Sequence, residues 1–71
     1  MKAVYDPETD TLTLILRDDI PIAESDEIKE GLIIDYSEDN KIVSIEMLDA
    51  SENVAEPQAF SYEIKGRKAT A

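Results

Sequence analysis

Residues 11–17 decide the fold class, and they have the sequence TLTLILR. Leucine stands at positions 12, 14 and 16, and threonine stands at positions 11 and 13. Successive side chains of an extended chain point to opposite faces of a sheet, so this period of two predicts a β-strand with one apolar face. We expect the rest of the fold to be built around this strand.

Four other segments show the same alternation or a run of β-branched residues, and they are residues 2–5, 20–28, 32–36 and 42–48. Turn-forming residues separate them, such as Pro7 after the first segment and Asn40 before the last, where asparagine suits a left-handed conformation. Pro21 and the polar centre of residues 20–28 favour an edge position for that strand. The pattern predicts a mainly β fold, bordering on α+β, with an antiparallel meander of five to six short strands.

The segment after residue 48 predicts one short helix. Asp49 and Glu52 have the spacing of a capping box, and Pro57 cannot continue a helix, which places the helix near residues 50–55. Residues 59–64 alternate again, and they predict either a sixth strand or a segment that orders only against a partner. No linker separates two units, so the chain is expected to fold as one domain.

A chain of 71 residues is expected to need extra burial from a second chain. At this size only about 60% of the unfolded surface becomes buried, and without cysteine no disulfide can add stability. Apolar residues also occur on both faces of the predicted sheet, and the second face needs a cover from the C-terminal segment or from another subunit. This predicts a homodimer, with the candidate interface residues Ile15, Ile33, Ile42, Leu48, Phe60, Tyr62 and Ile64.

The composition excludes several kinds of chemistry. The chain has no histidine and no cysteine, which excludes Ser-His-Asp and Cys-His nucleophiles, iron–sulfur clusters and a structural zinc site. Close pairs of carboxylates arise by chance among 17 acidic residues, and so small a domain hardly encloses the pocket that two-carboxylate catalysis needs. We therefore expect no enzymatic activity, no catalytic residue and no cofactor.

Asp6, Glu8 and Asp10 have the spacing of the first three ligands of an EF-hand calcium loop. The other positions do not fit, because Thr11 stands where the loop needs glycine and Arg17 where it needs a bidentate glutamate. These acids are expected to form a solvated turn, and no specific metal site is predicted.

Negative charge is concentrated in the first part of the chain. The formal net charge is −10, and residues 1–49 contain 14 acidic and 4 basic side chains, whereas Lys65, Arg67 and Lys68 form a basic cluster near the C-terminus. Binding to nucleic acid or to an anionic membrane depends on Lys and Arg at phosphates, so neither is an expected partner. The sequence shows no signal peptide and no apolar run of about 20 residues, which predicts a cytoplasmic protein.

Three motifs follow one another along the first 51 residues: YDPETDTLTL at 5–14, AESDEI at 23–28 with GLIID at 31–35, and VSIEMLDAS at 43–51. In this order they resemble a prokaryotic family catalogued as domain of unknown function 2283. The resemblance implies a compact antiparallel β domain at residues 1–51, with residues 52–71 as a C-terminal extension of the same domain. It implies structural roles, as turn acceptors, a strand-entry glycine and a cap, for Tyr5, Asp6, Asp10, Gly31, Glu46 and Asp49.

The resemblance also implies a role in protein interaction, because members of that family are often encoded beside small basic RNase-like toxins. A chain of net charge −10 would be attracted to such a partner. The leading hypothesis is a non-enzymatic protein-interaction module, antitoxin-like, that masks a small basic protein. The alternatives are a self-associating structural protein with no charged partner and, less favoured, a weak divalent-metal or ligand binder.

Overall fold

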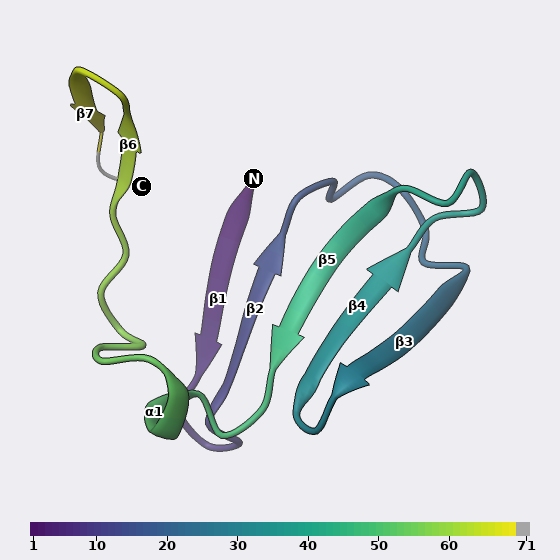
Figure 1. Ribbon diagram of the computed structural model, residues 1–71, viewed down its shortest axis with the longest axis horizontal. Coiled ribbons are helices and arrows are strands. Elements are labelled where there is room, and N and C mark those ends of the chain that lie inside the picture. The colour runs from purple at the N-terminus through teal and green to yellow at the C-terminus, as the bar shows by residue number, and fades with distance from the viewer. Residues whose placement is uncertain (70–71) are drawn as a thin grey trace.

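Five strands pair into one antiparallel sheet in the computed structural model, which describes residues 1–69 (Figure 1). The strands are β1 (Lys2–Asp6), β2 (Thr11–Ile15), β3 (Glu24–Lys29), β4 (Leu32–Tyr36) and β5 (Ile42–Met47). Their order is β1-β2-β5-β4-β3, so β5 lies at the centre and β1 and β3 at the edges. The mainly β antiparallel fold and the edge position of the third strand are confirmed.

The connection from β2 to β3 interrupts the predicted meander. Turns join β1 to β2, β3 to β4 and β4 to β5, whereas the chain after β2 crosses to the far edge of the sheet (Figure 1). β2 pairs with β5 in a register that sets Leu12 beside Met47 and Leu14 beside Ile45, an apolar match that the polar β3 cannot offer. The strand predicted at residues 20–28 begins only at Glu24, because the residues before it form this crossing.

Left-handed backbone conformations occur at four of the turns between strands, at Asp10, Gly31, Asn40 and Gly66. Asn40 has φ 64° between β4 and β5, as predicted, and Gly31 has φ 81° between β3 and β4. The carbonyl of Gly31 accepts a hydrogen bond from the N–H of Leu48 at 2.8 Å, which ties this turn to the end of β5. Glycine suits the position because residues with a Cβ rarely adopt such a φ.

The predicted helix is present but shorter than expected. α1 spans Ala50–Asn53, a single turn, because Val54 is extended. The predicted capping box is wrong, since Asp49 has φ 52° and its side chain makes no capping hydrogen bond. The N–H of Ser51 is bound instead by the carboxylate of Asp10.

The C-terminal residues leave the sheet beside β1 (Figure 1). There β6 (Tyr62–Ile64) and β7 (Arg67–Ala69) form a separate antiparallel hairpin. The strand predicted at residues 59–64 thus begins only at Tyr62 and pairs with β7 rather than with the sheet. Residues 70 and 71 of the predicted extension lie outside the described residues. Within the described range, no helix has the length and apolar character to cross a membrane.

Candidate interaction surface

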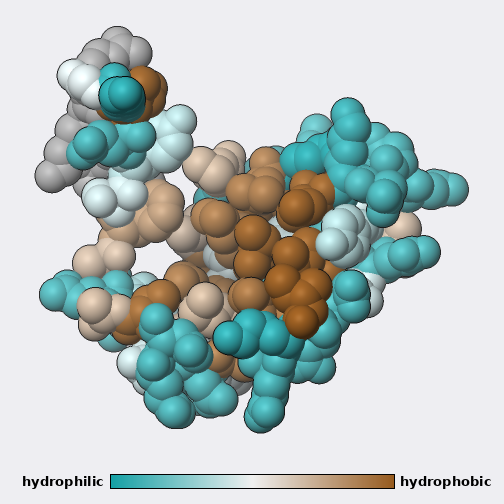
Figure 2. Space-filling view, in the orientation of Figure 1, coloured by the Kyte–Doolittle hydropathy of each residue, from teal (hydrophilic) through white to brown (hydrophobic). Residues whose placement is uncertain are grey.

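One face of the sheet is apolar and only partly covered. Cross-strand pairing brings alternate side chains of four strands together on it, and none of them is fully buried. Figure 2 shows apolar side chains gathered over the middle of the sheet, with hydrophilic side chains around them. We call this surface the apolar face, and its residues are Ala3, Tyr5, Leu12, Leu14, Leu32, Ile34, Ile45 and Met47.

Few apolar side chains are fully buried in the single chain. Among residues 1–66, whose side chains the structure describes, the buried apolar residues are Val43, 3% exposed, and Ala50, 0% exposed. Burial of apolar surface is the main favourable contribution to folding. The predicted apolar face of the sheet therefore exists, but the chain itself provides little to pack against it.

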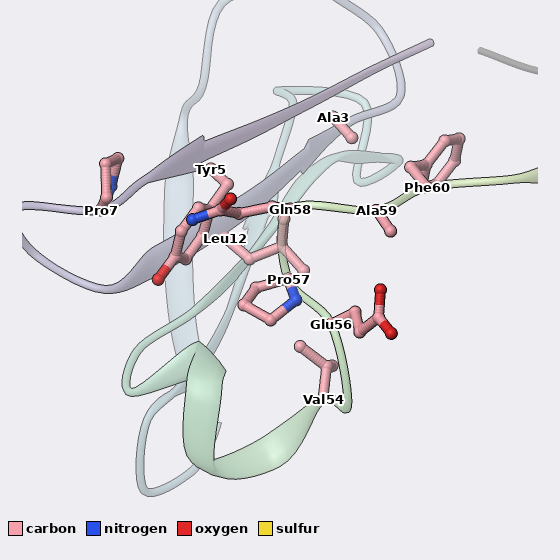
Figure 3. A pocket seen from close by; sticks show the side chains of 10 residues that line it. All are labelled: Ala3, Tyr5, Pro7, Leu12, Val54, Glu56, Pro57, Gln58, Ala59 and Phe60. Atoms are coloured by element: carbon pink, nitrogen blue, oxygen red, sulfur yellow. The ribbon is translucent and has the colours of Figure 1, made fainter.

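The C-terminal segment covers one margin of the apolar face. A groove of about 620 Å³ lies between them, with Ala3 and Tyr5 on the β1 side and Val54, Pro57 and Phe60 on the other (Figure 3). No residue of β4 or β5 lines this groove in the described part of the chain. The centre of the apolar face is thus left open.

The opposite face of the sheet carries a polar row that is buried at Asp35 and Ser44 and exposed at Ser25. Ser25, Asp35 and Ser44 are cross-strand partners in β3, β4 and β5. The Ser25 hydroxyl donates to Oδ1 of Asp35 and the Ser44 hydroxyl donates to Oδ2, each at 2.6 Å. Asp35 is only 2% exposed, so these bonds supply the partners that a buried carboxylate requires.

Glu46 places a second carboxyl group beside Asp35. Its hydrogen bond with Asp35 raises the pKa of Glu46, and partial burial and the charge of Asp35 raise it further. Burial by itself would raise the pKa of Asp35, but hydrogen bonds from Glu46, Ser25 and Ser44 outweigh burial and hold that pKa below its usual range. The two shifts have opposite directions, so Glu46 is the member of the pair that takes up a proton first as pH falls.

A hollow of about 560 Å³ lies above this polar row. Ile20 and Ile22, from the segment that crosses between β2 and β3, form part of its wall, and Asp35 and Glu46 are among its lining residues. Proton exchange is the chemistry that this carboxyl pair can support. In residues 1–69 no three His, Cys, Asp or Glu side chains are grouped as metal ligands would be.

Asp10 connects the β1–β2 turn to α1. The Tyr5 hydroxyl donates to Oδ1 of Asp10 at 2.7 Å, and Ser51 donates its N–H to Oδ1 at 3.0 Å and its hydroxyl to Oδ2 at 2.6 Å. The hydrogen bonds from Ser51 and Tyr5 lower the pKa of Asp10, and the bond to Asp10 raises the pKa of Tyr5. Asp6 instead accepts the N–H of Glu8 at 2.9 Å within its own turn, so the acids at 6 and 10 take part in separate contacts.

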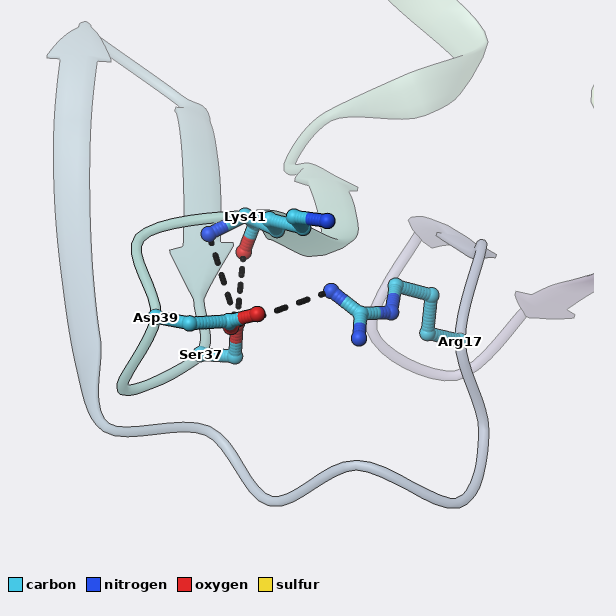
Figure 4. Close-up of polar contacts among 4 residues, drawn as sticks. All are labelled: Arg17, Ser37, Asp39 and Lys41. Carbon is cyan, nitrogen blue, oxygen red and sulfur yellow. Dashed lines mark hydrogen bonds and ion pairs between the residues drawn. The ribbon is translucent and has the colours of Figure 1, made fainter.

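Polar contacts also hold the turn between β4 and β5 (Figure 4). The Ser37 hydroxyl donates to Asp39 and accepts the N–H of Lys41 at 3.3 Å. Arg17, two residues after the end of β2, places Nη1 4.0 Å from Oδ1 of Asp39. The hydrogen bond from Ser37, with the charges of Arg17 and Lys41, outweighs burial and lowers the pKa of Asp39.

The seven predicted interface residues do not form one surface. Ile15 and Ile33 lie on the face of the polar row and are partly exposed. Phe60 lines the groove beside β1, whereas Tyr62 and Ile64 are exposed in the β6–β7 hairpin. The remaining two, Ile42 at the start of β5 and Leu48 after its end, are also exposed. The C-terminal segment therefore borders the apolar face and not the face of the polar row. A role of these seven residues in an interface stays a prediction.

Sequence analysis missed the polar row. Asp35 stands among apolar residues in LIIDY, which gave the one available signal, because a charged residue inside an apolar strand needs partners. Its partners Ser25 and Ser44 come from two other strands, and their relation to Asp35 depends on the register of the sheet.

A family model, described as a protein of unknown function (DUF2283), matches residues 2–51 of this chain. The chain belongs to the DUF2283 family. The DUF2283 match includes the whole five-stranded sheet and ends at Ser51 in α1, so it contains every member of the Tyr5, Asp10 and Ser51 contact. No curated protein and no solved structure matches this DUF2283 chain.

Proposed function

We propose that this protein is a cytoplasmic, non-enzymatic protein-interaction module that binds and masks a small basic protein, in the manner of an antitoxin. The edge strand β3 is the observation that supports this proposal, because all six of its residues are exposed. An edge strand presents unpaired N–H and C=O groups to which another strand can be added. Its sequence, ESDEIK, contains three acids, so a basic strand is the complementary partner.

Further exposed acids lie outside β3. Glu30 is in the β3–β4 turn, and Asp18 and Asp19 are in the segment that crosses from β2 to β3. Within the described side chains an ion pair joins Arg17 and Asp39, and the acids of β3 take part in none. An unneutralised surface of one sign accelerates the encounter with a partner of the opposite sign and disfavours other partners.

The proposal is tested by searching for a small basic reading frame beside this gene and by measuring the binding of its product to this chain. We expect a stable complex that weakens as salt is added, because exposed charges are screened. Glu24→Lys with Asp26→Lys should weaken binding by about tenfold or more, since both changes reverse charge on β3. The double variant Glu8→Lys with Glu52→Lys is the control, because it changes the net charge by the same amount at positions outside β3. It should keep most of the affinity for the basic protein. Equal losses in the two double variants, or no binding by the natural chain, would contradict the proposal.

A self-associating structural protein is the second candidate function, and the open apolar face favours it. No charged partner is needed in that case, and the acids only keep the assembly in solution. A stable oligomer together with a gene neighbourhood that lacks a small basic reading frame would support this candidate over the first.

A further inference from the structure

We infer that a second copy of this chain covers the apolar face, with the two sheets packed face to face and the twofold axis parallel to the strands. This inference goes beyond the proposed function, because it concerns the apolar face and the β3 side chains that border it, whereas strand addition would use the unpaired backbone of β3. The dimer can therefore be tested without any basic partner, and either proposal can fail alone.

The amount of exposed surface supports a second copy. The chain has an accessible surface of 5534 Å², whereas a compact protein of 7.9 kDa is expected to expose about 4,400 Å². Its radius of gyration is 13.1 Å, against about 11 Å expected for 71 residues. The excess of about 1,100 Å² is a whole-chain value that includes the hairpin beyond β1 (Figure 1), and it is of the same order as the roughly 800 Å² that each partner buries in a standard interface.

The chain's own C-terminal segment does not provide the missing cover. Val54, Pro57 and Phe60 approach the apolar face only on the β1 side, at the groove of Figure 3. Leu14 and Ile45, cross-strand partners near the middle of the sheet, are outside that groove and stay partly exposed. A second sheet fits this shape, because two sheets pack face to face at about 10 Å with interdigitating side chains.

The distribution of charge selects the orientation of the two copies. Glu24 and Asp26 are the register partners of Tyr36 and Ile34, so they border the apolar face along the β3 edge. The β6–β7 hairpin, whose turn contains the exposed Lys65, lies beyond the opposite edge, next to β1 (Figure 1). A twofold axis parallel to the strands exchanges the two edges, so each acidic β3 meets the hairpin side of its partner. An axis across the strands would set β3 against β3, where like charges repel.

The mass in solution is the first test of the inference. Light scattering at micromolar concentration should give about 16 kDa, twice the chain mass of 7.9 kDa. Ile45→Asp should abolish the dimer, because it puts a charge in the centre of the apolar face. Val4→Asp is the matched control, since Val4 is 40% exposed in β1 and, as the register partner of Thr13, lies on the opposite face, and the dimer should persist. A folded monomer of the natural sequence, or equal effects of the two variants, would overturn the inference.

A spin label tests the orientation in a dimer whose apolar face is unchanged, so a variant that fails to fold cannot confuse the result. The chain has no cysteine, so Lys65→Cys gives a single attachment point in the hairpin. Spin-labelled chains without nitrogen-15 are mixed with nitrogen-15 chains of natural sequence. In the nitrogen-15 chains, the amide resonances of β3 and of the β4–β5 turn should broaden, because the spin label of the partner lies close to them. Broadening confined to β1 and the hairpin, or no broadening, would overturn the proposed arrangement.

Discussion

Ser51 donates two hydrogen bonds to the carboxylate of Asp10, which precedes it by 41 residues. The N–H groups in the first turn of a helix have no partner within the helix, so they need an acceptor from elsewhere. Asp10 supplies that acceptor for α1 and also receives the hydroxyl of Tyr5. One side chain thus joins the first turn between strands to the only helix in residues 1–69, at the end of the DUF2283 segment.

Asp10→Ala should destabilise the protein more than Asp6→Ala does. The first change removes the acceptor for Tyr5 and Ser51, whereas Asp6 accepts only the N–H of Glu8 within its own turn. Because the pKa of Asp10 is lowered, its stabilising effect is present above the ordinary value of 3.8 and is lost as pH falls through the lower folded value. Urea unfolding followed by circular dichroism measures both effects at pH 7 and pH 3. Equal midpoints for the two variants at pH 7 would contradict this role of Asp10.

The positions of the strands could be predicted from sequence because they depend on local alternation. Residues 32–36 form β4 as predicted, and the strand expected at residues 11–17 exists as Thr11–Ile15. The pairing of strands could not be predicted in the same way. β2 lies beside β5 because Leu14 and Ile45 match across the sheet, a relation between residues far apart in the chain.

The cap of α1 and the polar row escaped prediction for the same physical reason. Asp49 has the local signature of a cap, but a distant acceptor, Asp10, already occupies the N–H of Ser51. Asp35 looks like any polar residue in a strand until the register places Ser25 and Ser44 on its two oxygens. Local patterns predict elements, whereas the contacts between elements determine which polar side chains are buried.

Gly31→Ala should destabilise the protein by about 1–2 kcal/mol, the cost of a left-handed conformation for a residue with a Cβ. Gly31 has φ 81°, and its added Cβ would lie 3.7 Å from the carbonyl oxygen of Leu48, an ordinary contact, so the backbone angle alone causes the loss. Gly66→Ala is the matched control, because Gly66 has φ 89° in the β6–β7 hairpin, outside the sheet. The midpoint temperature of thermal unfolding of the sheet should fall for Gly31→Ala and hardly change for Gly66→Ala. A larger shift for Gly66→Ala would show that the hairpin, and not the β3–β4 turn, limits stability.

Ser44→Ala should cost about 1–3 kcal/mol, because it removes a hydrogen bond from a buried charged group. The Ser44 hydroxyl donates to Oδ2 of Asp35 at 2.6 Å, and Ser44 is 4% exposed, so water cannot easily replace it. Ser61→Ala changes an exposed serine in the C-terminal segment and should leave the urea midpoint nearly unchanged. A urea midpoint of Ser44→Ala equal to that of the natural chain would mean that Ser25 and Glu46 supply enough hydrogen bonds to Asp35 without Ser44.

Glu46→Gln should change how stability depends on pH. The pKa of Glu46 is raised by its hydrogen bond with Asp35, so its contribution is fully present below the ordinary value of 4.5 and is lost as pH rises through the higher folded value. Glutamine donates a hydrogen bond to Asp35 at every pH, so the variant should lack this loss and be at least as stable as the natural chain at pH 7. Urea midpoints at pH 4, 5, 6 and 7 measure the difference, and Glu52→Gln controls for the removal of one exposed charge. A parallel pH profile for the natural chain and Glu46→Gln would show that Glu46 does not share a proton with Asp35.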